Sequence, residues 1–328
     1  MATTHDTLAD LALARGTLDR AGLERRDPDV LTRLLADANT RVAEVRDGRL
    51  LVGDDAGHPH LVLREPRNSD ADRLAVHLGR DEAGIAYVAV ISPDPPAGDG
   101  AASLDASGWL TLRQSGPGLS DRDAGIFTAA LALANWHDSH SRCSRCGGLT
   151  EPVQAGWVRL CEVDGSEHYP RTDPAVIMSV LDPDERLLLG RSPAWPERRF
   201  SVLAGFVEPG ESFAHAVERE VLEEVGLVID ETRYLGNQPW PFPSSVMIGY
   251  EARTRQTELA LDHVELAEAR WFSRSEYRQL LRNNAIRVPT GISIAKRIIE
   301  YWLGETVEAA TARGDFEGGD PDRRRRPS

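Results

Sequence analysis

The sequence predicts an α+β protein built from more than one domain. Its 328 residues exceed the roughly 100–200 residues of an ordinary single domain. Short apolar runs typical of strands fill the first half, whereas strands alternate with helical patterns in the second. We therefore expect a mostly β domain over 1–138, a small cysteine-bearing segment over 139–170, an α+β domain over 171–305 and a disordered tail over 306–328.

The strands of the first domain are indicated by short alternating apolar runs. Residues 40–52, TRVAEVRDGRLLV, place Asp47–Gly48 between two such runs, and this dipeptide favours a hairpin turn. Residues 121–138 have the apolar spacing of a helix. We expect further strands at HLVLRE, LAVHLG, IAYVAVI and GWLTLRQ.

The elements of the second domain begin with three strands and an acidic helix. The strands are predicted at AVIMSVLD, RLLLGRS and FSVLAGFV, and the helix at 212–225. Residues 234–253 are expected to form a loop followed by a strand. The segment EARWFSRSEYRQLLRN predicts a strand that enters a helix, and residues 293–305 predict a last helix.

Composition excludes several classes of protein. A net charge of −14 argues against a broad nucleic-acid-binding surface, although it leaves room for a nucleotide in a local pocket. No apolar run approaches the roughly 18–20 residues of a membrane-spanning helix, and the first residues lack a secretory signal. The three cysteines are odd in number and clustered, which does not fit a disulfide framework. We expect a cytoplasmic protein.

The helix over 212–225 carries an unusual concentration of glutamates. Ala214, Val221, Leu222 and Val225 are expected to face the core, while Glu220, Glu223 and Glu224 share the other half of the helix. Such crowded carboxylates could form a solvated face. They could also bind a cation, in which case oxygen ligands favour Mg²⁺ or Mn²⁺.

The spacing around this helix resembles the Nudix signature G-x5-E-x7-R-E-U-x-E-E-x-G-U, where U is a bulky apolar residue. Every specified position is matched between Gly205 and Leu227. The resemblance to Nudix hydrolases implies an α/β/α sandwich with a mixed sheet, and cleavage of a nucleoside diphosphate linked to another group. It also implies metal binding by Glu220, Glu223 and Glu224, and an ion pair between Glu211 and Arg219.

A second motif, NQPWPFPSS at 237–245, resembles the array S-Q-P-W-P-F-P-x-S of the NADH pyrophosphatase family. Asn237 replaces the first serine of that array. Three prolines would make a rigid loop that presents flat aromatic faces and polar edges to a nucleotide; the alternative is a loop packed at the edge of the core. The resemblance implies substrate contacts from Gln238, Pro239, Trp240, Pro241, Phe242, Pro243, Ser244 and Ser245.

Other segments resemble the same family and imply further site residues. Glu265 matches a metal-binding or base carboxylate, although an exposed helical glutamate is the alternative and Glu268 is close by. The remaining residues implied are the Ala204 carbonyl at the metal, Phe206 and Tyr169 stacking on the substrate, and Ala295 contacting it.

The cysteines resemble the zinc ribbon of this family. Cys143 and Cys146 form one knuckle, and Cys161 follows. Asp164 stands where the family has a fourth cysteine, so the fourth ligand is either Asp164 or His168. A ribbon that has lost its zinc and is held by packing is the alternative.

The resemblance implies a Mg²⁺- or Mn²⁺-dependent enzyme that hydrolyses NAD(H) to AMP and nicotinamide mononucleotide. It also implies removal of NAD caps from RNA, and a homodimer in which Tyr169 reaches the partner's site. Two rival hypotheses are a Nudix hydrolase of another dinucleotide, such as ADP-ribose, and a module that senses nucleotides without cleaving them.

Overall fold

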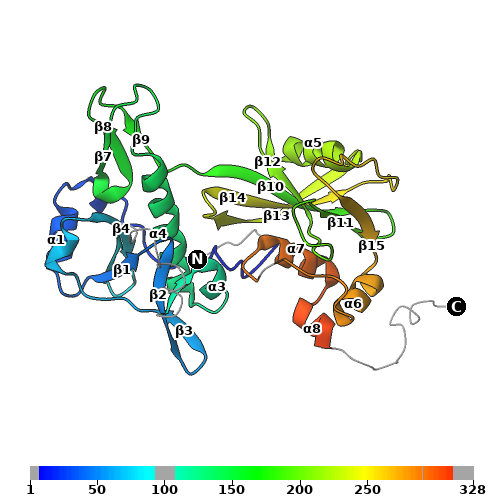
Figure 1. Ribbon diagram of the computed structural model, residues 1–328, viewed down its shortest axis with the longest axis horizontal. Coiled ribbons are helices and arrows are strands. Elements are labelled where there is room, and N and C mark those ends of the chain that lie inside the picture. Colours follow the sequence, from blue (N-terminus) through cyan, green and yellow to red (C-terminus); the bar gives the residue numbers. More distant parts are fainter. Residues whose placement is uncertain (1–6, 93–107, 290, 313–328) are drawn as a thin grey trace.

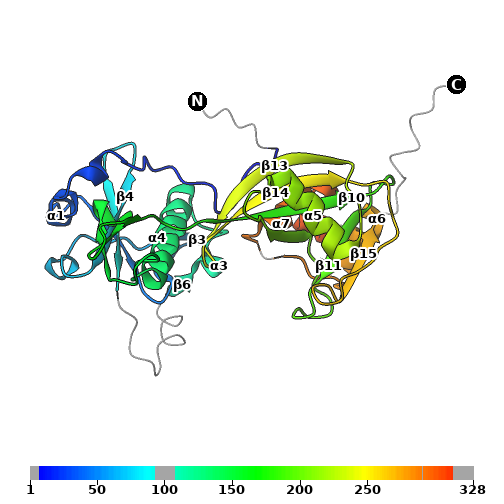
Figure 2. The ribbon, with the colours of Figure 1, turned by 90° about the horizontal axis from the view of Figure 1, so that it is seen from above.

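The computed structural model describes residues 7–92, 108–289 and 291–312, arranged as two lobes (Figure 1). The N-terminal lobe is mostly β with one long helix, and a small three-stranded sheet stands on it. An extended connection leads from that small sheet into the C-terminal lobe, as the second view shows (Figure 2). This arrangement agrees with the predicted order of a β-rich domain, a ribbon and an α+β domain.

The N-terminal lobe contains two three-stranded sheets packed beside α4, with strand orders β1-β5-β4 and β3-β2-β6. Ser120 caps α4 by accepting a hydrogen bond from the Asp123 backbone N–H. The helices are η1 (Glu24–Arg26), α1 (Val30–Ala36), η2 (Asn68–Asp70), α3 (Leu112–Ser115) and α4 (Asp121–Ser139). The strands are β1 (Arg41–Val45), β2 (Arg49–Asp55), β3 (His58–Leu61), β4 (Leu74–Arg80), β5 (Ala86–Ile91) and β6 (Trp109–Thr111).

Two expectations for this lobe are corrected. Asp47 and Gly48 do form a turn with positive φ angles, but only Arg46 and Arg49 bridge across it. Beyond the turn, β1 pairs with β5 and β2 pairs with β3 and β6, because each strand finds its apolar partners in a different sheet. The strand predicted at GWLTLRQ ends at Thr111, since Thr111 and Gln114 form a capping box that starts α3.

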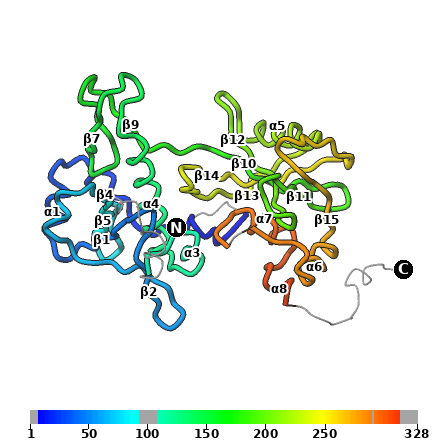
Figure 3. The backbone as a smooth tube through the Cα atoms, in the orientation of Figure 1, coloured from blue at the N-terminus to red at the C-terminus, as the bar shows by residue number. Residues whose placement is uncertain are grey.

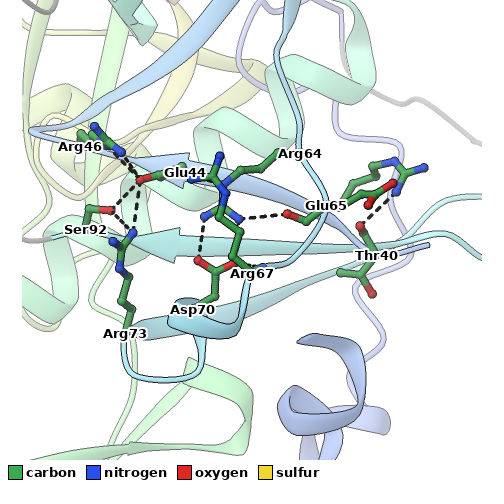
Figure 4. A network of polar contacts seen from close by, with 10 residues as sticks. Thr40, Glu44, Arg46, Arg64, Glu65, Arg67, Asp70, Arg73 and Ser92 are labelled. Carbon is green, nitrogen blue, oxygen red and sulfur yellow. Dashed lines mark hydrogen bonds and ion pairs between the residues drawn. The ribbon is translucent and has the colours of Figure 1, made fainter. Parts of the chain in front are cut away.

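A network of charged groups stabilises the N-terminal lobe (Figure 4). The Glu44 carboxylate is bound by Arg46 at 2.6 Å, Arg64 at 3.1 Å and Arg73 at 3.3 Å. Burial by itself would raise the pKa of Glu44, but hydrogen bonds from Arg46, Arg64 and Ser92 lower it to about 2. The Glu44 carboxyl is therefore ionised at neutral pH.

We expect Glu44→Gln to lower the free energy of unfolding at neutral pH by about 1–3 kcal/mol, since hydrogen bonds to a charged group are lost. The difference between the variant and the wild type should be complete above the ordinary glutamate pKa of 4.5 and shrink as the pH falls towards about 2. Urea unfolding at several pH values measures it. A difference that grew on acidification would contradict this assignment.

The C-terminal lobe is a six-stranded mixed sheet in the order β13-β14-β10-β11-β15, with β12 also paired to β10. Strands β10 and β14 run parallel, and the other pairs are antiparallel. The strands are β10 (Asp173–Leu181), β11 (Leu187–Arg191), β12 (Leu203–Phe206), β13 (Glu231–Trp240), β14 (Ser245–Arg253) and β15 (Glu268–Phe272). The helices are α5 (Phe213–Val225), α6 (Arg274–Arg282), α7 (Ile294–Leu303) and α8 (Val307–Ala312).

Helices cover both faces of this sheet, which confirms the predicted α/β/α sandwich. On β10, Val176, Met178 and Val180 belong to the core shared with α5. Ile177 and Leu181, which point to the other face, belong to the core shared with α6, α7 and α8. None of the helices among the described residues is long and apolar enough to cross a membrane.

Three boundaries differ from the expectation. Residues 231–240 form β13, paired along β14, so the segment at 237–245 is a strand end and a tight turn and not a free loop. Helix α8 lies where a tail was expected from residue 306, because Val307 and Ala310 bury one face of it; residues 313–328 lie outside the described part. Leu8 and Leu11 pack into the core of the C-terminal lobe, although residues 1–138 were expected to form the N-terminal domain.

Candidate active site

Helix α5 carries the acidic signature and is defined by its sequence at both ends. Ser212 caps its start by accepting a hydrogen bond from the His215 N–H, and Gly226 ends it in a left-handed conformation with φ of 72°. The buried stripe runs through Val217, Val221 and Val225. The prediction that Leu222 faces the core is wrong: its side chain is 53% exposed, because it lies one residue beyond the buried stripe.

Three carboxylates meet at the inner edge of α5. Glu220, Glu224 and Glu265 each offer an oxygen, and these oxygens lie within 4.8 Å of one another. Burial, and then the charges of Glu220 and Glu265, raise the pKa of Glu224 to about 8. Burial also raises the pKa of Glu220. A divalent cation would relieve this repulsion, and an oxygen-only donor set suits Mg²⁺ or Mn²⁺.

Glu265 reaches this cluster from a turn that precedes β15, far from α5 in the sequence. Its neighbour Glu268 faces elsewhere and lies 3.6 Å from the Arg191 guanidinium. Of the two glutamates considered for this role, the structure thus brings only Glu265 to the carboxylates of α5.

Arg219 holds the loop before α5 against the helix. Its guanidinium binds both Glu211 oxygens, at 2.8 and 3.0 Å, and donates to the carbonyl oxygen of Phe206 at 2.8 Å. It also contacts Glu220 at 2.8 Å and Glu223 at 2.9 Å. Glu223 therefore lies beside the cluster, paired with Arg219, and is not one of the three carboxylates that meet.

Close packing fixes the position of the Glu220 carboxylate. A Cβ atom placed on Gly205 would lie 1.8 Å from the Glu220 Cδ, so only glycine leaves room for this carboxylate beside β12. Ala204, next to Gly205, lines a cavity of about 240 Å³ together with Glu224 and Glu265. Trp195 also lines this cavity and was not singled out from the sequence, where it has no recognisable motif around it.

The two aromatic residues expected to stack on a substrate are both exposed. Tyr169 is 62% and Phe206 is 63% exposed. Phe206 pairs with Ala175 of β10, six residues beyond Tyr169, and an extended chain of that length spans roughly 20 Å. The connection between β9 (Glu167–His168) and β10 is indeed extended (Figure 3). One chain therefore does not bring these two rings together around one base.

The proline-rich segment lies against the N-terminal lobe. Asn135 of α4 donates hydrogen bonds to the carbonyl oxygens of Pro241 and Pro243, both at 3.1 Å. Trp240 and Phe242 pack edge to face, with ring centroids 4.9 Å apart. Residues Pro241, Phe242, Pro243 and Ser244 line a separate cavity of about 740 Å³ that contains none of the three clustered glutamates.

Gln238 and Ala295 differ from the expected ligand contacts because their side chains are buried. The Gln238 amide accepts a hydrogen bond from Leu13 N–H at 3.2 Å and donates to the Ile292 carbonyl at 2.9 Å. Gln238 therefore joins the hairpin of β13 and β14 to the segment around Leu13 and to the residues just before α7. Ala295 is 2% exposed and belongs to the core beneath α7.

The ribbon is formed by β7 (Thr150–Val153), β8 (Val158–Cys161) and β9, with η3 (Gln154–Gly156) between the first two strands. Ligand atoms of Cys143, Cys146, Cys161 and Asp164 lie within 4.8 Å of one another. The Sγ atoms of Cys146 and Cys161 are 3.5 Å apart, and the Cys143 Sγ is 3.7 Å from an Asp164 oxygen. These separations suit a tetrahedral Zn²⁺ with bonds of about 2.0–2.3 Å. His168 bonds instead to Ser166, at 3.2 Å.

Comparisons with known proteins agree with this arrangement. The NUDIX domain model matches residues 171–290, the NADH pyrophosphatase zinc ribbon model matches 138–169, and the NADH pyrophosphatase-like rudimentary NUDIX domain model matches 39–136. The chain is 39% identical to the NAD-capped RNA hydrolase NudC of Mycobacterium bovis, over 88% of this chain and 94% of that protein.

Other matches cover less of the chain. Human NAD-capped RNA hydrolase NUDT12 is 39% identical over 56% of this chain and 43% of its own length. Among solved structures, a NUDIX hydrolase from Nitrosomonas europaea aligns with a TM-score of 0.39 at 21% identity, over 51% of this chain and 94% of that one.

Proposed function

Since the chain belongs to the NADH pyrophosphatase family of Nudix hydrolases, we propose that it hydrolyses the pyrophosphate of NAD(H), free or as the 5′ cap of an RNA. Water adds to one phosphorus, and the bond from that phosphorus to the bridging oxygen breaks. Free NAD(H) gives AMP and nicotinamide mononucleotide, whereas a capped RNA gives nicotinamide mononucleotide and an RNA with a 5′ monophosphate. Near neutral pH two protons are released, because each product carries a new phosphate monoester that ionises. The observation that carries this proposal is the meeting of Glu220, Glu224 and Glu265 beside the cavity of about 240 Å³.

Each part of the site has a separate task in this proposal. Glu220, Glu224 and Glu265 would hold Mg²⁺ or Mn²⁺, with the Ala204 carbonyl oxygen as a further ligand. When bound, the metal supplies Lewis acidity towards the phosphates and lowers the pKa of water. Arg219 keeps the loop and the Glu220 carboxylate in place through the contacts described above.

The substrate base would stack on Phe206, and Tyr169 would close over it from the partner subunit of a homodimer. The roughly 20 Å of extended chain between Tyr169 and the position of Phe206 supports an intersubunit role. If the protein were a fully active monomer in solution, Tyr169 would not be a residue of the site.

The three cysteines form no disulfide, which supports a cytoplasmic location.

Product analysis tests the proposal directly. The protein is incubated with NADH, NAD⁺, ADP-ribose or NAD-capped RNA in the presence of Mg²⁺ or Mn²⁺, and the products are separated by liquid chromatography. We expect AMP and the nicotinamide mononucleotide from NADH and NAD⁺. Faster cleavage of ADP-ribose would indicate the rival enzyme, and no cleavage of any substrate would indicate a sensing module.

Phe206→Ala should impair hydrolysis of NADH selectively. Removing a ring that stacks on a base costs about 1–3 kcal/mol, or roughly 5- to 150-fold. A small pyrophosphate ester that lacks the base should be affected much less, because the carboxylates are untouched. The loss in kcat/KM caused by Phe206→Ala is measured for each substrate. Equal losses on the two substrates would mean that Phe206 supports the fold or the metal site.

We also propose that the ribbon binds one Zn²⁺ through Cys143, Cys146, Cys161 and Asp164. Cys146→Ser and Asp164→Ala should each lose zinc and unfold at a lower temperature, because metal binding contributes folding free energy. His168→Ala is the matched control and should keep both. Metal analysis and thermal unfolding measure these effects; zinc retained in Asp164→Ala but lost in His168→Ala would identify His168 as the fourth ligand.

A further inference from the structure

A second cavity lies between the two lobes, and it has no part in the hydrolysis proposed above. Its volume is about 740 Å³, within the roughly 300–1,000 Å³ of sites for small ligands, which often lie between domains. Its walls come from α3, α4, the 241–244 turn and the start of β10. The turn lies directly beside α4 (Figure 1). This cavity therefore has the size and the place of a binding site.

Arg113 is the chemically most distinctive residue in its wall. Its guanidinium carbon lies 3.8 Å from the ring centroid of Phe242 and 4.8 Å from that of Trp240. No described residue forms a hydrogen bond or an ion pair with Arg113, and the charge of Arg199 adds to burial in lowering its pKa. Aromatic stacking fixes the plane of a guanidinium and leaves its N–H groups free, and this planar fork matches phosphate oxygens.

The other charged groups around the cavity suit the rest of a nucleotide. Arg171 binds Asp173 at 2.6 Å, and Asp173 also accepts a hydrogen bond from Ser244 at 2.9 Å, so this carboxylate is already partnered. Asp47 and Asp138 also line the cavity. Carboxylates of this kind accept hydrogen bonds from ribose hydroxyls. An isolated inorganic anion has no hydroxyl groups to donate to these carboxylates, whereas a phosphate joined to a ribose does.

Strand β10 connects this cavity to the carboxylate cluster. Asp173 lies at the cavity, and Val176 pairs with Gly205, on which the Glu220 carboxylate packs. Three residues of strand span roughly 10 Å. Asp173 and Ala175 point to the same face, and Ala175 is paired with Phe206. This face is opposite to the one that α5 covers, and Phe206 lies on it at the end of β12. A short single strand that continues from a base stacked on Phe206 could therefore reach the cavity.

We propose that this cavity binds the first RNA nucleotides that follow an NAD cap, with Arg113 contacting a phosphate. The inference rests on the proposed hydrolysis of NAD caps and assigns the RNA body to a place separate from the dinucleotide. A local site of this kind suits a chain of net charge −14, which lacks the overall positive charge of a broad nucleic-acid surface.

The test compares NAD with an NAD-capped RNA of six nucleotides as substrates. Arg113→Ala should lower kcat/KM for the capped RNA roughly tenfold or more, through a higher KM, because charged hydrogen bonds are lost. Turnover of NAD should be unchanged. Arg113→Lys keeps the charge and should restore part of the loss. Arg33→Ala, an exposed arginine of α1 away from the cavity, is the matched control and should behave as the wild type.

Salt dependence and binding give independent readouts. For Arg113→Ala, the slope of log affinity against log salt should fall by about 0.7, the value for one phosphate contact on a single strand. Binding of the fluorescently labelled capped hexamer to metal-free protein, followed by anisotropy, should weaken by the same factor as kcat/KM.

The outcomes separate this inference from the proposed function. If Arg113→Ala lost activity equally on NAD and on capped RNA, the cavity would hold the dinucleotide itself. If its turnover of capped RNA were unchanged, the cavity would hold neither ligand. Either result overturns the inference but leaves the proposed hydrolysis of NAD intact. If the wild type cleaves neither substrate, the proposed function fails, and the anisotropy measurement alone decides whether Arg113 binds RNA.

Discussion

Replacing Glu224 by glutamine should lower kcat for NADH by at least about 10²-fold, equivalent to about 2.7 kcal/mol of transition-state stabilisation. Glutamine keeps the size of the side chain but removes the charge that Glu224 would offer to a divalent cation. Glu224 is 5% exposed, and the two carboxylates that meet it, those of Glu220 and Glu265, are themselves assigned to the cation, so neither can replace it. Steady-state kinetics at several concentrations of Mg²⁺ and Mn²⁺ measure the effect.

The fold should survive this change. Burial, and then the charges of Glu220 and Glu265, raise the pKa of Glu224 to about 8. A neutral amide at this position avoids both costs, so the unfolding temperature in metal-free buffer should not decrease. Glu218→Gln is the matched control, since Glu218 lies on the exposed side of the same helix. Turnover near that of the wild type at saturating Mg²⁺ would show that Glu224 is not a metal ligand.

Gly205→Ala should reduce activity by a similar factor, about 10²-fold, without adding or removing a charge. The new Cβ would lie 1.8 Å from the Glu220 Cδ and about as close to both of its oxygens, at 2.0 and 2.1 Å. Atoms cannot approach so closely, so the carboxylate must leave its place beside Glu224. Steady-state kinetics, together with titration of Mn²⁺ binding, should show weaker metal affinity.

A control separates this displacement from a general cost of replacing glycine. Gly22 has no atom within 4 Å of an added Cβ and no positive φ, so Gly22→Ala should have wild-type activity. If Gly205→Ala kept full activity, the Glu220 carboxylate would have to work from another position, and its assignment to the cluster would be wrong.

The parts of the site that were predictable from the sequence are those encoded by local spacing. Glu220 and Glu224 are one helical turn apart, so any helix over 212–225 places them together. Ser212 and Gly226 mark the ends of that helix by their own conformational preferences. Resemblance to a family added Glu265, Phe206 and Tyr169, none of which could be placed by periodicity.

Other features depend on contacts between distant segments. The turn at Asp47–Gly48 was predicted, but the pairing of its strands was not, because pairing follows the burial of each strand in a different sheet. The proline-rich motif predicts a rigid loop, yet Gln238 is buried and hydrogen-bonded to the backbone of Leu13 and Ile292, which lie far from it in the sequence.

The sequence by itself determined an acidic helix with defined ends and three cysteines with one aspartate near them, and its resemblance to a family added an arginine that holds the loop before the helix. Only the tertiary structure decided which carboxylates meet, that Glu223 pairs with Arg219 beside them, and that Arg113, stacked on Phe242 and Trp240, lines a cavity between the lobes. The physical reason is that side-chain identity and helix periodicity are local properties. Burial, charge repulsion and cavities arise where segments far apart in the chain pack against one another.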